Sequence, residues 1–432
     1  NVTVGRNNTF IGAAAGDLIT EPSDNTAIGA FALTSDDLGS KNTAVGRTAL
    51  SDLNYATATD GHHTAVGYFA GARLTQGTAS TLVGSLAGED LTTGDGQAFG
   101  YFALGSAITA SANTAIGQQC MASNRYMDNN TGVGFQCLQA MDQATNVDSY
   151  NTAVGWSTGY ELTTGTKNTL IGADSGRNIT TGSNNTALGL DALLGNSSAK
   201  TTGNNNTALG FRAGKSIQGA AEDNTLVGTE AGSALTTGND NTIIGNTACD
   251  TTLVNGSGNT VIGNNTDTSA SGGSNQIVIG SNVDGGGDST ARLGTSSGSA
   301  TLNIDGSDTS WAAASDERLK KDIADCSVGL NFVKELRPVT YKWNAKNAVA
   351  SDLPQYNKDS SDPVYGSGKT EHGFVAQEVK KVIDKYSGLK DGFTMWSEDP
   401  NGTQQVAPAA LIPMLVKAIQ ELEARVATLE GE

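Results

Sequence analysis

The sequence predicts a mostly β protein: a β-solenoid of about 17-residue repeats at residues 1–280, a neck or linker at 281–314, and a small α+β domain at 315–432. Three observations support this fold class. A glycine-centred motif recurs at a fixed period through the first part, the composition changes near residue 310, and apolar residues near the C-terminal end follow heptad spacing.

The repeated motif is Asn-Thr-x-(Ile, Val or Leu)-Gly, and each copy is predicted to form a short strand followed by a turn. Most successive glycines lie 17 residues apart, and three gaps of 21 residues predict inserted loops. About sixteen coils at roughly 4.8 Å each predict a rod on the order of 75 Å long. The motif glycines are Gly12, Gly29, Gly46, Gly67, Gly84, Gly100, Gly117, Gly134, Gly155, Gly172, Gly189, Gly210, Gly228, Gly245, Gly263 and Gly280.

The apolar residue before the glycine is present in every copy, which predicts a stacked core column. Period-2 alternation places the motif threonine on the same side as this residue. The residue three positions after the glycine is nearly always small, which predicts close backbone approach. Because such a coil encloses little volume, we predict that neighbouring chains complete the core as a homotrimer.

Two features of the repeat leave alternatives open. The asparagine and threonine columns favour self-bonding ladders over an ice-binding surface, because ice-binding threonine rows face outward. Aromatic residues follow the glycine at Tyr68, Tyr101, Phe135, Trp156 and Phe211. These residues lie two positions after the apolar residue that precedes the glycine, so they are expected on the same face as the core. This placement favours packing between coils or subunits over stacking against sugar rings.

Charge and composition exclude several function classes. A formal net charge of −18 argues against nucleic acid as a partner, because a phosphate binder needs a basic face. No apolar run is long enough for membrane insertion. The acidic loops show no repeated calcium-ligand spacing, so neither a metal nor a cofactor is predicted.

Four cysteines lack metal-ligand spacing. Cys120 and Cys137 lie one repeat apart at the same repeat position, which places them on adjacent coils within disulfide range. Both stand where most repeats have alanine. We therefore favour free thiols that act as small buried residues over a disulfide.

The sequence of residues 315–432 predicts a compact mixed domain. A helix is expected at 328–336, a strand at 339–343, a strand end at 373–374 and a helix at 376–383. A coiled-coil helix is expected at 412–430, with Pro413 in its first turn. The seam of this helix comprises Ile412, Leu415, Ile419, Leu422, Val426 and Leu429.

Four blocks of this domain carry a family resemblance: SDERLKKDI at 315–323, RPVTYKW at 337–343, HGFVAQEV at 372–379 and the amphipathic C-terminal helix. Together they resemble the endosialidase-type intramolecular chaperone, an auto-processing domain of phage tail fibres and tail spikes. The repeats are similar to the β-roll heads of trimeric bacterial adhesins. The two resemblances imply a homotrimer.

The chaperone resemblance also implies catalytic residues for self-cleavage. The chain would be cut between Ser315 and Asp316, with Ser315 as the nucleophile and Lys320 as the base. A lysine base needs burial or nearby cations to lower its pKa, and Arg318 and Lys321 flank Lys320. Asp322 stands where the family commonly has asparagine, and its carboxylate would oppose this effect. At most, a single-turnover serine self-cleaving peptidase is expected.

The predicted function is a trimeric tail-fibre rod that attaches a phage to its host and carries its own folding chaperone. The expected partners are a host-surface receptor, either a glycan or an outer-membrane component, and an upstream fibre or baseplate protein. The expected location is the virion tail fibre, outside the cell after assembly in the host cytoplasm. An upstream attachment region is expected, since Asn1 lies within a repeat.

Two alternatives remain. One is a surface adhesin fibre of a predatory-type bacterium that carries the same chaperone. The other is a polysaccharide-degrading tail spike, which would need a pair of positioned carboxylates in a groove. A DNA-binding factor with this chaperone is disfavoured by the acidic charge.

Overall fold

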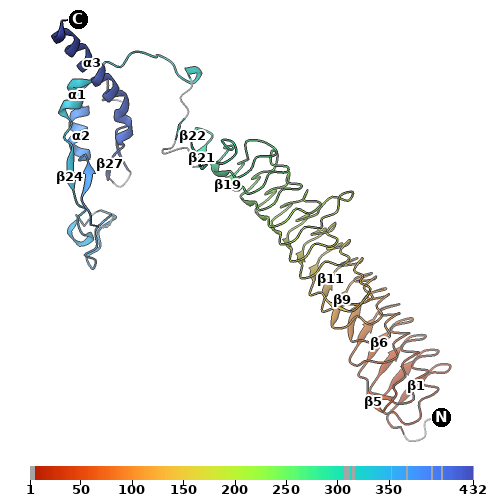
Figure 1. Ribbon diagram of the computed structural model, residues 1–432. Coiled ribbons are helices and arrows are strands. Elements are labelled where there is room, and N and C mark those ends of the chain that lie inside the picture. Colours follow the sequence, from red (N-terminus) through yellow and green to blue (C-terminus); the bar gives the residue numbers. More distant parts are fainter. Residues whose placement is uncertain are drawn as a thin grey trace. The chain divides into compact units, whose positions relative to one another are not determined.

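The computed structural model describes residues 5–305, 312–313, 317–351, 353–365, 368–390, 393–399 and 402–431. The chain divides into two compact units, residues 1–314 and 315–432. The first is a β-solenoid and the second a smaller α+β unit (Figure 1), so the predicted fold class is confirmed. The trimer and the coiled coil stay predictions.

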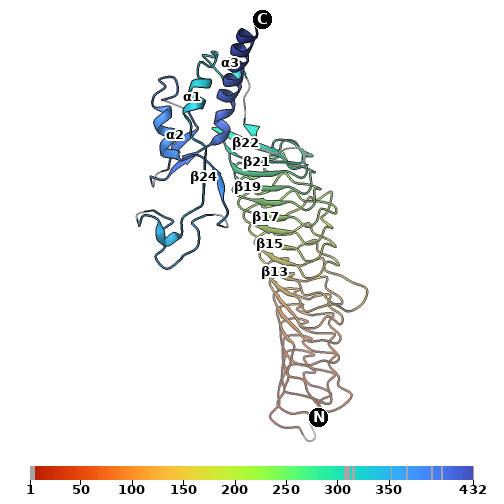
Figure 2. The same ribbon diagram turned by 60° about the vertical axis from the view of Figure 1, so that its left-hand side comes forward.

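The solenoid is built from three- to six-residue strands that stack in parallel, one per coil, as both views show (Figures 1 and 2). Equivalent motif residues pair in register, for example Thr26 with Thr43 and Ile28 with Val45. The strands of this stack are β1 (Thr9–Ile11), β2 (Thr26–Ile28), β4 (Thr43–Val45), β6 (Thr64–Val66), β7 (Thr81–Val83), β8 (Gly96–Phe99), β9 (Asn113–Ile116), β11 (Thr131–Val133), β13 (Thr152–Val154), β14 (Thr169–Ile171), β15 (Thr186–Leu188), β16 (Thr207–Leu209), β17 (Thr225–Val227), β18 (Thr242–Ile244), β19 (Thr260–Asn264) and β20 (Ile277–Ser281).

The interior of the coil is lined by the middle residue of each strand, which corrects the predicted core. Ala27, Ala115 and Leu170 are fully buried, whereas the residue before the glycine faces out; Ile116 is 41% exposed and Leu188 49%. A coil of about 17 residues is too thin to hold both columns, so only the middle residue of the strand lies inside; it is often alanine, and elsewhere a larger residue such as Leu82. We call the outward apolar residues the strand column: Ile11, Ile28, Val45, Val66, Val83, Phe99, Ile116, Val133, Val154, Ile171, Leu188, Leu209, Val227, Ile244, Ile262 and Ile279.

The predicted asparagine ladder is confirmed inside the coils. Asn168 is fully buried; its backbone N–H donates to Asn151 Oδ1 at 3.0 Å, and its Nδ2 donates to Gly182 O at 3.0 Å. One coil later, the Asn185 backbone N–H donates to Asn168 Oδ1 and the Asn185 Nδ2 donates to Gly203 O. The motif threonines instead share the outward face of the strand column, so the prediction that they lie on the core side is wrong.

Close stacking explains the glycine and the small residue that follows it. Gly117 has a φ of 135°, and a Cβ there would lie 2.2 Å from Gly134 O on the next coil. Three residues further on, Cys120 is fully buried, as are Cys137 and most of the alanines at this position. Both cysteines are free thiols, as predicted.

The aromatic residues after the glycine lie on the surface of the single chain. Tyr68, Tyr101 and Trp156 are each nearly half exposed. Phe135 and Trp156 do stack between adjacent coils, with ring centroids 6.2 Å apart and planes 8° from parallel. Packing between subunits stays a prediction.

The inserted loops add short strands on another side of the coil. Strand β3 (Gly39–Ser40) pairs with β5 (Thr59–Asp60), and β10 (Met127–Asp128) pairs with β12 (Val147–Asp148). The third insertion forms a loop around residues 195–200. The solenoid ends on β21 (Thr290–Thr295), which pairs with β20 in parallel and with β22 (Gly298–Asn303) in an antiparallel hairpin. Strand β23 (Ala312–Ala313) pairs with β22.

A polar network interrupts the interior near the first insertion. His63 takes the asparagine position of its coil, and its Nε2 lies 2.8 Å from Tyr55 Oη. Tyr55 donates its own proton to Gly77 O, so His63 Nε2–H is the donor between the two rings. The Ser80 backbone N–H donates to His63 Nδ1. Burial lowers the pKa of His63 to about 4, because the charged ring would lose its hydration.

In the described part of the second unit, three α-helices and two small sheets pack around one apolar core. Its elements are η1 (Glu317–Leu319), α1 (Leu330–Glu335), β24 (Val339–Tyr341), η2 (Lys346–Ala348), β25 (Glu371–Gly373), α2 (Ala376–Ile383), β26 (Trp396–Glu398), β27 (Gln404–Val406), η3 (Pro408–Leu411) and α3 (Ile412–Glu430). Phe332, Val379, Ile383, Met395 and Met414 form the centre of the core. Among the described residues, no helix has the length and apolarity needed to span a bilayer.

Candidate functional site

The predicted cleavage motif is described only in part. Ser315 and Asp316 lie outside the described residues. Glu317–Leu319 form the single turn η1, and the Lys320 backbone N–H donates to Glu317 O at 3.0 Å. The Lys320 side chain is exposed, as are its neighbours Lys321 and Asp322. Asp322 has a φ of 56°, so the chain turns sharply just after the predicted base.

The two central blocks of the domain meet in space. Val339 of β24 pairs with Gly373 of β25, and Tyr341 pairs with Glu371, in an antiparallel ladder. Arg337 Nε, just before β24, donates to Glu378 Oε2 on α2 at 2.8 Å. The ion pair holds the pKa of the Glu378 carboxyl below its usual range, because the guanidinium stabilises the charged form. RPVTYKW and HGFVAQEV thus form one structural unit.

An aromatic groove of about 550 Å³ lies beside this ladder. Trp343 contacts both Tyr341 and Tyr365 edge to face, with ring centroids 5.3 and 4.9 Å apart. His372 and Phe374 line the same groove. The motif RPVTYKW contains two of these rings, whereas Tyr365 lies in a loop whose sequence gave no signal.

Helix α3 has two apolar faces with different surroundings. Met414 and Ala418 are buried in the core, while Ile419 is 65% exposed and Leu429 86%. The helix also carries Glu421, whose Oε2 accepts the backbone N–H of Leu330 at 2.9 Å and so caps the first turn of α1. The predicted heptad seam faces away from the core of its own chain.

The comparisons with known proteins identify this unit. Residues 315–387 match a family model described as the chaperone of endosialidase. The C-terminal unit carries an endosialidase chaperone domain. Searches of curated proteins and of solved structures found no match.

The match to the chaperone domain covers the cleavage motif, α1, β24, β25 and α2, and it ends before β26, β27 and α3. An endosialidase chaperone domain after a long β-solenoid fits a phage-type fibre or spike with its chaperone at the C-terminus. The recognition of the chaperone domain is therefore confirmed over the first three sequence blocks, and the C-terminal helix lies beyond the match. In the described part of the chain, no group of three or more His, Cys, Asp or Glu side chains could hold a metal ion.

Proposed function

We propose that the protein is a homotrimeric tail-fibre rod whose C-terminal domain brings three chains together and is then released by self-cleavage. The rod would join an upstream fibre or baseplate protein and contact a receptor on the host surface. The observation that carries the proposal is that each of the two units has one exposed apolar surface, the strand column in the solenoid and the heptad seam of α3 in the C-terminal unit.

The first surface is the strand column. It is apolar in all sixteen coils, and members such as Ile116, Leu188 and Ile244 are 38–49% exposed in the single chain. Monomeric proteins rarely keep so long a contiguous apolar surface in water. In a trimer, the three sheets would face one another and bury this column along the whole rod.

The second surface is the α3 seam. Ile412, Ile419 and Leu422 are 46–65% exposed, and their heptad spacing is that of a helix that packs on identical helices. The seam lies beside the buried face of α3, which holds Met414 and Ala418, and stays exposed, so three copies could join without opening the core of the domain. The number three comes from the family resemblance.

The chaperone role follows from folding kinetics. Every coil pairs with residues about 17 positions away in parallel, and such non-local pairing is slow and leaves strand edges open. Three chains that are held together at one end would begin stacking in a common register. Release of the domain after stacking would then prevent the reverse reaction.

Cleavage would depend on assembly. Lys320 is exposed in the single chain, whereas a lysine that removes a proton from serine needs surroundings that disfavour its charged form. Neighbouring subunits would supply those surroundings. Ser315 would attack the bond to Asp316 only after the three chains have joined.

The test compares the wild type with Ser315→Ala and Lys320→Ala by denaturing gel and intact mass. Fragments that end and begin at the Ser315–Asp316 bond are expected in the wild type only. Leu422→Asp in the α3 seam should abolish both trimer and cleavage, whereas the control Glu423→Gln on the same helix should leave both intact. A Leu422→Asp protein that still forms trimers would refute the seam.

A further inference from the structure

The surface of the middle coils holds an aromatic and charged cluster outside the strand column. Its residues come from three successive coils, from the turns after two of the strands and from the inserted loop of the third coil. We call it the Trp156 patch, formed by Trp156, Tyr160, Glu161, Asp174, Arg177 and Lys200.

Stacking of coils fixes the aromatic part of the patch. The Asp174 backbone N–H donates to Trp156 O at 2.9 Å, which places the second coil of the patch directly on the first. The Arg177 guanidinium lies over both rings, 5.7 Å from the Trp156 centroid and 5.4 Å from that of Tyr160. Trp156 overlaps Phe135 only in part, since a centroid separation of 6.2 Å between parallel rings means an offset stack. Trp156 is therefore held firmly while 48% of it stays exposed.

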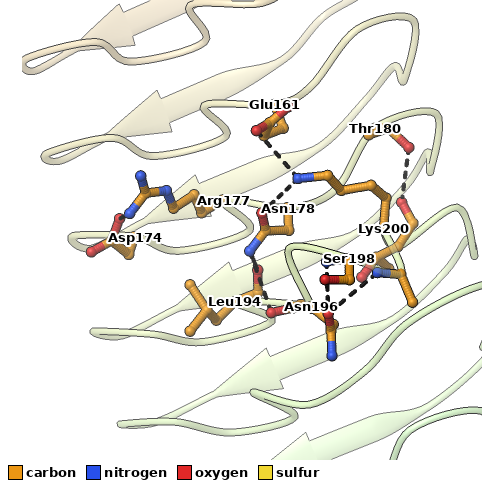
Figure 3. Close-up of polar contacts among 12 residues, drawn as sticks. Glu161, Asp174, Arg177, Asn178, Thr180, Leu194, Asn196, Ser198 and Lys200 are labelled. Atoms are coloured by element: carbon orange, nitrogen blue, oxygen red, sulfur yellow. Dashed lines mark hydrogen bonds and ion pairs between the residues drawn. The ribbon is translucent and has the colours of Figure 1, made fainter.

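The polar part of the patch consists of charges that are already paired (Figure 3). Arg177 Nη1 lies 3.0 Å from Asp174 Oδ1, and Lys200 Nζ lies 3.2 Å from Glu161 Oε1. Lys200 also donates to Asn178 Oδ1 at 3.1 Å, and Asn178 Nδ2 in turn donates to Leu194 O. Lys200 comes from the inserted loop, so the insertion brings a cation to the patch. These contacts hold the donors and acceptors in fixed positions, which lowers the entropy lost on binding.

Subunit packing does not account for the patch. A contact along the whole rod requires an apolar residue in every coil, and the strand column provides one. The position of Trp156 instead changes from coil to coil, as in Tyr101, Gln118, Phe135 and Ala173.

The chemistry selects a neutral sugar. The apolar face of a pyranose ring can lie against the part of the Trp156 indole that Phe135 and Arg177 leave exposed. Sugar hydroxyls both donate to carboxylates and accept from guanidinium or ammonium groups. Because each charge is paired, the patch offers no net charge to an ionic ligand. A polyanionic glycan would also be repelled by a chain of formal net charge −18.

We propose that the Trp156 patch binds a neutral glycan of the host surface, with a pyranose ring against Trp156 and its hydroxyls bound by the Asp174–Arg177 and Glu161–Lys200 pairs. The proposal rests on the host-attachment function and names the class of receptor.

The experiment titrates the full-length protein with maltoheptaose, dextran and yeast mannan, and with polysialic acid as the anionic comparison, by isothermal calorimetry. Trp156→Ala should weaken binding of a neutral glycan by about tenfold or more, whereas Trp156→Phe should keep most of it. Tyr101→Ala is the matched control: it lies in the same column, is 49% exposed, and should bind like the wild type.

Sedimentation of each variant separates the possible outcomes. Loss of glycan binding in a Trp156→Ala protein that stays trimeric supports the proposal. Absence of binding to all three neutral glycans, equal binding by wild type and Trp156→Ala, or binding of polysialic acid alone would overturn it and leave the trimeric fibre intact. Dissociation of the Trp156→Ala trimer would assign the residue to a subunit contact. A monomeric wild type would instead refute the proposed fibre.

Discussion

Replacement of Asp36 by asparagine should stabilise the solenoid at neutral pH. Asp36 is fully buried at the coil position that holds Ile19 and Leu53 in the neighbouring coils. Its Oδ1 accepts the Gly39 backbone N–H at 2.8 Å, but burial dominates and raises the pKa of the Asp36 carboxyl to about 6. The ordinary value is near 4, so the folded chain binds this proton more tightly than the unfolded chain does.

The sign and the size follow from that difference. Because the pKa is raised on folding, the full stability is present below about pH 4 and is lost as the pH rises toward 6. A difference of about two pKa units costs about 3 kcal/mol per chain above pH 6. Asparagine carries no charge, and Asn124 already occupies the equivalent coil position with its Oδ1 bonded to the Met127 N–H and its Nδ2 to Met127 O.

Denaturant unfolding at pH 8 and at pH 3.5, at one fixed chain concentration, tests this prediction. Asp36→Asn should raise the unfolding free energy by about 2 to 3 kcal/mol at pH 8 and by close to nothing at pH 3.5. A variant that is less stable at pH 8, or a gain of equal size at both values, would show that burial of the charge does not control this position.

Three further changes test other contacts. His63→Asn should raise the free energy of unfolding at pH 5 by about 2 kcal/mol. The lowered pKa of His63 means that the wild type loses stability as the pH falls from 6.5 toward 4, and asparagine does not titrate. An equal loss of stability between pH 6.5 and pH 4 in both proteins would contradict this. Ile116→Glu should dissociate the trimer, since three buried carboxylates would meet at the same level of the rod. Ser197→Glu on an exposed loop should leave the trimer intact. Equal sedimentation of the two variants would contradict the claim that the strand column packs between subunits. Glu421→Ala should lower the free energy of unfolding of the C-terminal unit by about 1 kcal/mol, because the α1 helix loses its cap. Glu423→Ala is the neutral control. Equal stability of the two variants would show that Glu421 does not stabilise α1.

The period of the repeat predicted the solenoid. The alternation of side chains along each strand, however, could not predict which face of the strand points into the coil. Many repeats have two consecutive apolar residues, such as Leu170 and Ile171, which point to opposite faces of the strand. Either of the two is compatible with a core. The structure decides because Leu33 and similar residues also fill the interior, which leaves room for only one side chain from each strand. An alanine such as Ala27 gave no hydrophobic signal, although it fills the interior.

The C-terminal domain shows the same limit. The helix predicted at 376–383 is confirmed at these bounds, and the heptad helix begins at Ile412 as expected. The Glu421 cap on Leu330 joins residues 91 positions apart, and the Arg337–Glu378 pair joins residues 41 apart. No local pattern announces such contacts, because they form only when the helices have packed.

The most direct test of the fibre is the mass of the uncleavable Ser315→Ala protein in sedimentation equilibrium. Three chains of 44.0 kDa predict a single species of about 130 kDa. A folded, soluble species of 44 kDa across the micromolar range would show that the strand column and the α3 seam need no partner, and would contradict the account.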